Sequence, residues 1–144
     1  MNKKIPLLAE IERLRFLRSH QLLSKINLHP SQSHLLLNVS FKEGLSQQSL
    51  AKAMMIKPST LTVMLKRMEK NNLIVRKKEA TDARILRVYL SDQGKELVNQ
   101  IILLIKQMED ELYQDFTKEE KDLSKDILNK FKENLKRSIV DGSN

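Results

Sequence analysis

Along most of this chain, apolar residues recur every three or four positions, the spacing that places them on one face of an α-helix. This period predicts four helices in the first half of the chain and two more in the second half. Their expected ranges are 7–26, 31–41, 47–54, 58–70, a helix that starts after Ser91 and a helix that starts after Thr117. Between residues 73 and 90 the period changes to two, which predicts two strands, over 73–78 and 84–90, joined by a turn.

Capping and turn-forming residues stand at the breaks between these segments. Ser31 and Ser46 are expected to cap the second and third helices, because their hydroxyls can accept hydrogen bonds from free backbone N–H groups. The fourth helix starts either at Pro58, with Lys57 as its cap, or at Ser59. Further signals of the same kind are Gly44, the pair Asn71-Asn72, Ser91 and the Thr117–Glu120 capping box.

The order of segments between Leu45 and Leu90 is that of a helix-turn-helix followed at once by a two-stranded wing. Such a unit reads DNA. We therefore expect a mostly helical, α+β fold: a winged helix-turn-helix with flanking dimerisation helices. The 144 residues are expected to form a single domain, with a DNA-binding lobe over 31–90 and a helical dimerisation region over 1–30 and 91–140.

The fourth helix presents two different faces when it is turned by 100° per residue. Leu61, Leu65, Met68 and Met64 gather on one side and are expected to face the core. The opposite side is polar and basic, which suits a helix lying in a major groove. Its residues are Ser59, Thr62, Val63, Lys66, Arg67 and Lys70. Val63 can make only an apolar contact, such as one with a thymine methyl, and the alternative is an isolated exposed valine.

The predicted hairpin is also basic. An arginine at the tip of a hairpin fits a narrow, electronegative minor groove. Asp82 stands two residues before Arg84 and can both order the turn and pair with that arginine. The alternative is a solubilising hairpin whose charges contact nothing. The basic residues are Arg76, Lys77, Lys78, Arg84 and Arg87.

The net charge of +8 is unevenly distributed. Residues 41–90 hold eleven basic and four acidic residues, a net charge of +7, and residues 1–40 add +4. Residues 91–144 hold nine basic and twelve acidic residues, a net charge of −3. The positive excess thus coincides with the candidate DNA reader, as expected for a polyphosphate partner.

The stretch resembles the MarR-type winged helix-turn-helix regulators. The resemblance rests on LSQQSLAKAM, on IKPSTLTVMLKRMEKNNLI, on the DAR of the wing and on VYLSDQGKEL, and the order of helices extends it over nearly the whole chain. It implies an obligate homodimer formed by the terminal helices, bound to double-stranded, pseudo-palindromic promoter DNA, usually as a repressor. It often implies release by a small-molecule effector held between the dimer helices and the DNA-binding lobe.

Residue by residue, the resemblance places Ser59, Thr60, Thr62, Val63 and Lys66 in the major groove, with Arg84 as the wing arginine and Asp82 as its partner. Three positions depart from the family pattern. Met55 stands where the family usually has a glycine in the turn, Val63 where it often has an arginine, and Asn72 where it usually has a glycine before the wing.

Other classes of function find little support. We expect no enzyme, because there is no phosphate loop and no nucleophile with a recognisable base. We expect no cofactor: cysteine is absent, and the histidines are too scattered for a metal site, although His20 and His34 could meet around a pocket. No signal peptide is recognisable, and the longest apolar run, 101–105, is far too short to span a bilayer, so we expect a cytoplasmic protein without membrane contact.

The leading hypothesis is a sequence-specific transcriptional regulator that acts as a repressor. The first alternative is a DNA-binding architectural protein with little sequence specificity. The second is a winged module that reads a protein, although the basic outer face of the fourth helix argues against it. The dimer follows from the apolar residues of the fifth helix, which cover more than one of its faces.

Overall fold

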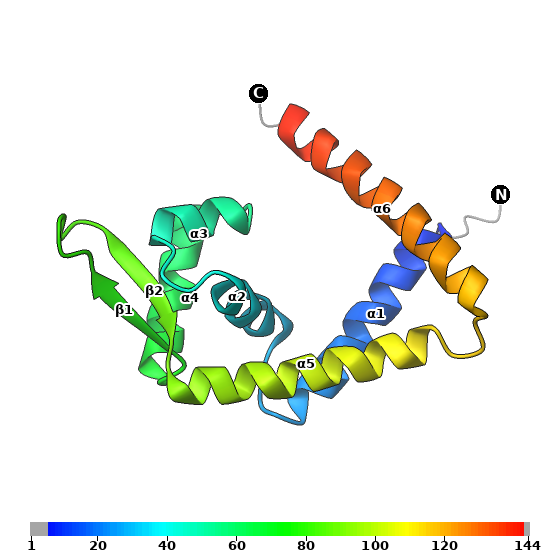
Figure 1. The fold of residues 1–144 in the computed structure, drawn as a ribbon, viewed down its shortest axis with the longest axis horizontal. Coiled ribbons are helices and arrows are strands. Elements are labelled where there is room, and N and C mark those ends of the chain that lie inside the picture. The colour runs from blue at the N-terminus through cyan, green and yellow to red at the C-terminus, as the bar shows by residue number, and fades with distance from the viewer. Residues whose placement is uncertain (1–5, 143–144) are drawn as a thin grey trace. The chain divides into compact units, whose positions relative to one another are not determined.

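The computed structural model describes residues 6–142. Its elements, in chain order, are α1 (Leu7–Ser24), α2 (Pro30–Phe41), α3 (Gln47–Ala53), α4 (Pro58–Lys70), β1 (Ile74–Lys78), β2 (Leu86–Leu90), α5 (Asp92–Leu112) and α6 (Lys118–Asp141) (Figure 1). The predicted fold class is confirmed: a mostly helical chain with one small antiparallel sheet. The chain forms two compact units, residues 1–108 and 109–144.

The hydrophobic core of the first unit lies among α2, α3, α4, the hairpin and the start of α5. The predicted inner face of α4 is confirmed, since Leu61, Leu65 and Met68 are fully buried. Two neighbours in the core are Leu50 on α3 and Val88 on β2, each 1% exposed. The same core includes Leu35, Leu36, Val39, Ala51, Met54, Leu73, Ile74, Leu90, Val98 and Ile101.

Two helix ends differ from the sequence prediction. Helix α1 ends at Ser24 rather than residue 26, because Asn27 adopts a positive φ of 54° and turns the chain. The prediction that Ser31 caps α2 is wrong. The cap is His29, whose Nδ1 accepts a hydrogen bond from the N–H of Ser31 at 3.2 Å. Gln32 completes a capping box by accepting from the N–H of His29. Proline at the first helical position allows the helix to start earlier.

The predicted starts of α3 and α6 are confirmed, and α3 ends at Ala53, one residue before its predicted end. The hydroxyl of Ser46 caps α3 and that of Thr117 caps α6, where Glu120 completes a capping box. Helix α4 starts at Pro58, with Lys57 in the cap position and no side-chain cap bond, which decides between the two predicted starts. Asn72 turns the chain out of α4 with a φ of 56°.

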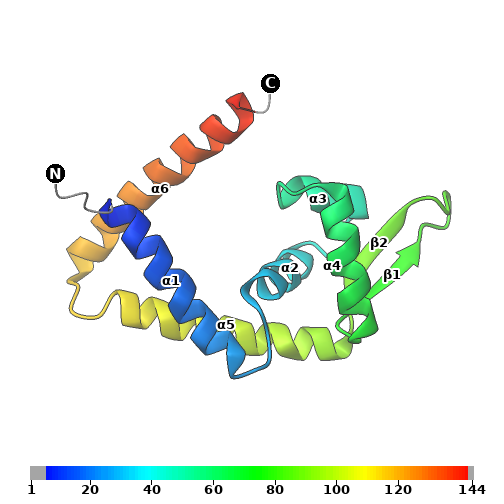
Figure 2. The same cartoon turned by 180° about the vertical axis from the view of Figure 1, so that it is seen from behind.

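The wing is an antiparallel hairpin in which Ile74 pairs with Leu90 and Lys78 with Leu86. Figure 2 shows it beside α4 from the opposite side. The second strand starts two residues later than predicted. The carbonyl of Asp82 accepts from the N–H of Ile85 at 3.0 Å, so that residues 82–85 form part of the turn.

The segment between α2 and α3 adds a short edge to this hairpin. The N–H of Gly44 donates to the carbonyl of Val88 at 2.9 Å, and the N–H of Val88 donates to the carbonyl of Leu45 at 3.0 Å. Gly44 has a φ of +82°, as predicted, and a β-carbon there would stand 3.2 Å from the Tyr89 ring. The sequence prediction did not include this pairing, because three residues are too few to show a period of two.

Ser91 starts α5, as predicted, by accepting from the N–H of Gly94 at 2.9 Å. Gly94 allows α5 to pass close to the chain before the wing, since a β-carbon there would lie 2.0 Å from the carbonyl oxygen of Leu73. The buried side of α5 is formed by Val98 and Ile101, and Leu97 is half-buried beside them.

The second unit contains the end of α5, a turn and α6. The Tyr113 and Phe116 rings meet edge to face with centroids 5.4 Å apart, and the hydroxyl of Ser124 donates to that of Tyr113 at 3.2 Å. Among the described residues, α6 has no buried side chain. Its apolar residues, all at least 42% exposed, are Leu123, Ile127, Leu128, Phe131, Leu135, Ile139 and Val140.

Candidate nucleic-acid interface

The outer face of α4 is polar and basic, as the sequence predicted. Val63 stands near its middle and is 68% exposed. Around it lie exposed side chains that can donate hydrogen bonds to bases or phosphates. These residues are Ser59, Thr60, Lys66, Arg67 and Lys70.

Thr62 differs from the other residues of this face because its hydroxyl is used within the fold. It donates to the carbonyl of Pro58 at 2.9 Å and accepts from the side-chain amide of Gln47 at 2.8 Å. The second contact joins α3 to α4. Thr62 is half-buried, so its main contribution is to the angle between the two helices of the motif.

In the turn between α3 and α4, a residue other than glycine adopts the left-handed backbone conformation. Met55 has a φ of 53° and is 61% exposed. Its N–H donates to the carbonyl of Lys52, and the N–H of Ile56 donates to that of Ala51, both at 3.1 Å. These bonds close the end of α3 in the manner of a Schellman motif. The turn is therefore preserved despite the departure from the family residue.

Arg84 lies at the tip of the wing, and its side chain is 91% exposed. Asp82 holds it through three hydrogen bonds: Oδ1 accepts from the backbone N–H at 3.0 Å and from Nε at 3.1 Å, and Oδ2 accepts from Nη2 at 3.3 Å. The hydrogen bonds from the Arg84 side chain and backbone lower the pKa of the Asp82 carboxyl. The predicted pairing of these two residues is present.

The side chain of Arg76 lies on the buried face of the hairpin. Arg76 pairs in register with the buried Val88, and its own side chain is only 15% exposed. Glu69, in the last turn of α4, accepts three hydrogen bonds from Arg76. Its Oε2 accepts from Nη2 at 2.6 Å and from Nε at 3.1 Å, and its Oε1 accepts from the backbone N–H at 3.3 Å. These hydrogen bonds from Arg76 outweigh burial and lower the pKa of Glu69.

Arg87 is also bound within the fold. Its Nη2 donates to both carboxylate oxygens of Glu79 at 3.0 Å, and its Nη1 donates to the carbonyl of Gly44 at 2.8 Å. Lys77, its register partner, lies 5.1 Å from the centroid of the Tyr89 ring. The wing cations whose side chains are exposed to solvent are therefore Lys77, Lys78 and Arg84.

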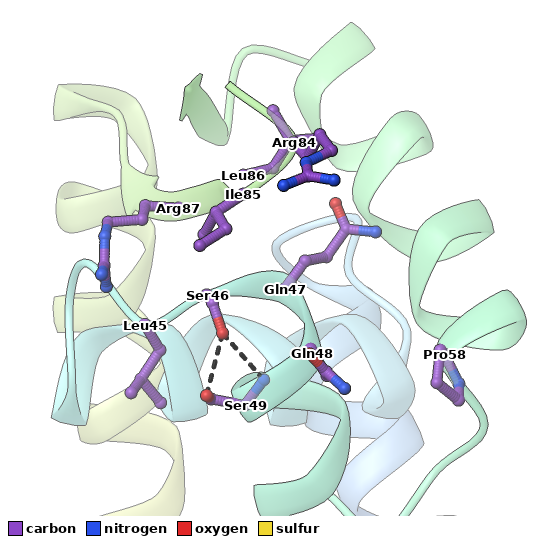
Figure 3. A pocket seen from close by; sticks show the side chains of 10 residues that line it. All are labelled: Leu45, Ser46, Gln47, Gln48, Ser49, Pro58, Arg84, Ile85, Leu86 and Arg87. Atoms are coloured by element: carbon purple, nitrogen blue, oxygen red, sulfur yellow. Dashed lines mark hydrogen bonds between the residues drawn. The ribbon is translucent and has the colours of Figure 1, made fainter. Parts of the chain in front are cut away.

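A groove of about 540 Å³ separates the wing from the helix-turn-helix (Figure 3). One wall is the start of α3 with Pro58, and the other is the segment from Arg84 to Arg87. Figure 3 shows the guanidinium of Arg84 above the side chain of Gln47, whose oxygen points toward it. That oxygen is buried and has no hydrogen-bond partner among the described residues.

The structure leaves most of the predicted site residues exposed on α4 and on the wing. The wing borders the groove through Arg84, and α4 borders it through Pro58, the first residue of the helix. Arg76 and Arg87 bind carboxylates of the fold. Sequence reasoning did not identify Gln47, Glu69 and Glu79 as parts of the site. Their partners lie fifteen, seven and eight residues away, and no periodic pattern marks such contacts.

The described residues contain no group of three or more histidine, cysteine or acidic side chains that could hold a metal ion. His20 lies against His29, with ring centroids 5.8 Å apart, and not against His34 as the sequence allowed. Across residues 6–142, no helix combines the length and apolar character that crossing a bilayer requires.

The arrangement of α3, α4 and the wing defines a winged helix-turn-helix. Residues 28–86 match the model of the MarR family. The chain is 30% identical over 79 residues to the uncharacterized HTH-type transcriptional regulator YsmB of Bacillus subtilis (strain 168), covering 55% of this chain and 54% of that protein. It is 32% identical over 72 residues to the HTH-type transcriptional repressor MdtR of the same organism, covering 50% and 46%.

The chain thus spans about half the length of the curated relatives it matches. A similar solved structure extends over more of the chain. It is the complex of S. aureus MepR with DNA, which has a TM-score of 0.79 and 26% identity and covers 89% of this chain and 95% of MepR.

Proposed function

We propose that this protein is a sequence-specific transcriptional regulator that binds double-stranded DNA as a homodimer and acts as a repressor. The observation that carries the proposal is the exposed, polar and basic face of α4 beside a wing tip whose Arg84 is 91% exposed. A helix of this kind fits a major groove, and an arginine at a hairpin tip fits the adjacent minor groove. The net charge of +7 over residues 41–90 supports the same partner.

Similarity to known proteins supports this assignment. MepR was solved as a DNA complex, and MdtR is described as a transcriptional repressor. In our proposal residues 31–90 form the DNA-binding lobe, and residues 1–30 and 91–140 form the dimerisation region. In this proposal the bound dimer represses because it excludes other proteins from the promoter that it occupies. A small-molecule effector that alters the spacing of the two lobes would release the DNA.

The homodimer is supported by apolar side chains that stand exposed on two separate helices. On α1, residues such as Leu7, Leu14 and Leu17 are between 46% and 72% exposed. On α6, the seven apolar residues described above are also exposed. Monomeric proteins rarely leave such contiguous patches in water, and a second copy of the chain would bury them.

The test is a selection of binding sites from a random duplex library, followed by titration of the selected and a scrambled duplex at one salt concentration. We expect an imperfect inverted repeat with half-sites one helical turn, about 34 Å, apart. The selected duplex should bind about 10³-fold more tightly than the scrambled one. Equal affinity for both duplexes would favour the architectural protein, and no affinity for either would refute DNA binding.

A further inference from the structure

Three of the five cations of the wing are bound to carboxylates of the protein itself, and two of these three, Arg76 and Arg87, are also partly covered by the fold, with side chains 15% and 37% exposed against 91% for Arg84. The inference from this difference rests on the proposed function. We propose that Arg76 and Arg87 do not contact DNA but act as positioning residues, which fix the angle of the wing relative to α4. In this assignment Glu69 and Glu79 assist DNA binding although they are negatively charged. The outward residues Lys77, Lys78 and Arg84 make the wing's contacts with DNA.

The pair of Arg76 and Glu69 joins the base of the wing to the end of α4. Three hydrogen bonds, one from the backbone and two from the guanidinium, reach the same carboxylate, the shortest at 2.6 Å. A fork of this kind fixes direction as well as distance, which a lysine ammonium cannot do. Because the Arg76 side chain is 15% exposed, it would have to give up both guanidinium bonds to reach a phosphate.

The pair of Arg87 and Glu79 is on the other face of the hairpin. Arg87 holds Glu79 with two bonds of 3.0 Å and the carbonyl of Gly44 with one of 2.8 Å. It therefore ties the end of the hairpin to the segment that leads into α3. The two arginines together attach the wing to α4 and to the segment that leads into α3, one through each face of the hairpin.

The length of the wing explains why such attachment matters. The tip lies about five residues beyond Arg76, which is about 15 Å of extended chain. A rotation of about 10° at the base would displace the tip by about 3 Å, which is the full length of a hydrogen bond. Arg84 could then no longer meet a minor groove while α4 occupies the major groove.

The two possible roles of Arg76 make opposite predictions for Glu69. If Arg76 contacts a phosphate, loss of the Glu69 charge frees the arginine and removes a repulsion, so binding becomes tighter. If Arg76 positions the wing, the same change releases the hairpin and weakens binding. The experiment compares Glu69→Gln, Arg76→Gln, the double variant and Arg76→Lys, with Lys77→Ala as a control on the opposite face of the same strand.

The probes are the duplex selected by the wild-type protein and its scrambled counterpart, each titrated at several salt concentrations. We expect each single variant to lose about five- to tenfold in affinity for the selected duplex, and the double variant to lose no more than the worse single variant. Arg76→Lys should be as weak as Arg76→Gln although it keeps the charge. The slope of log K against log salt should be unchanged, whereas Lys77→Ala, which removes one phosphate contact from each subunit of the dimer, should reduce it by about 1.8.

Folding is checked by circular dichroism, thermal unfolding and amide hydrogen exchange. We expect faster exchange in residues 74–90 of the variants, with the core of α4 unchanged. Glu79→Gln and Arg87→Lys test the second ion pair with smaller changes of side chain. Each of these variants should also bind the selected duplex more weakly than the wild-type protein. Tighter or unaltered binding by Glu69→Gln, or a salt slope reduced by about 1.8 in Arg76→Gln, would overturn the inference. A wild-type protein that selects no sequence would instead refute the proposed function.

Discussion

Arg84 is held in place before any DNA arrives, since Asp82 binds its backbone and its guanidinium together. We predict that Arg84→Ala costs about 1–3 kcal/mol of DNA binding. Its circular dichroism should be unchanged, because the side chain is 91% exposed and contributes little to folding. Arg84→Lys should recover part of the loss, and Asp82→Ala should lose less than Arg84→Ala, because it removes order rather than a DNA contact. Wild-type affinity in Arg84→Ala would leave the hairpin a structural element only.

Val63 is an apolar residue at the centre of a polar reading face, 68% exposed and without a hydrogen-bonding group. We predict that it contacts the methyl group of a thymine in each half-site. Replacing that thymine by deoxyuridine should cost about 1 kcal/mol in the wild-type protein and much less in Val63→Ala. Titration of a deoxyuridine series over the selected duplex measures this. Equal sensitivity of both proteins at every position would leave Val63 an exposed valine without a role.

At the scale of elements, the turn between α3 and α4 stores backbone strain. A non-glycine residue in the left-handed region costs about 1–2 kcal/mol, and glycine gives back about half of this through its greater freedom in the unfolded chain. We therefore predict that Met55→Gly raises the free energy of unfolding by about 0.5–1 kcal/mol. Lys52→Gly, at an exposed right-handed position in α3, is the matched control and should lower it by about 1 kcal/mol. Urea unfolding of the wild-type protein and the two variants measures these differences in free energy. Destabilisation by Met55→Gly would mean that the contacts of the Met55 side chain contribute more than the backbone strain costs.

The elements also show what could be predicted from the sequence. Helix faces followed from a period of 3.6, and helix ends from Ser46, Gly44 and Thr117, because each of these signals is local. His29 was missed as a cap because serine and threonine are the usual residues there. The partners of Arg76 and Arg87 could not be predicted, since the contacts depend on how the wing folds back on α4 and on the residues after α2.

At the scale of the whole molecule, the exposed apolar residues of α6 lead to a prediction about assembly. We expect light scattering at micromolar concentration to give twice 16.8 kDa. Phe131→Glu, which places a charge on the apolar face of α6, should shift the mass to that of a monomer and weaken operator binding. Lys130→Glu, next to it on the exposed polar side, is the control and should remain a dimer. A monomeric wild-type protein that binds the selected duplex tightly would contradict the proposed homodimer.

The pairing of residues 44–46 with β2 has a consequence for how the protein behaves at high concentration. An isolated two-stranded hairpin has two edges, and unpaired backbone groups on an edge are a template for aggregation. Here the edge of β2 is occupied by Gly44 and Leu45. On β1, the backbone N–H of Arg76 is occupied by Glu69, and Lys77 and Lys78 place like charges along the strand. The wing can therefore project far enough to contact another molecule while its edges are protected from pairing with strands of other copies of the chain.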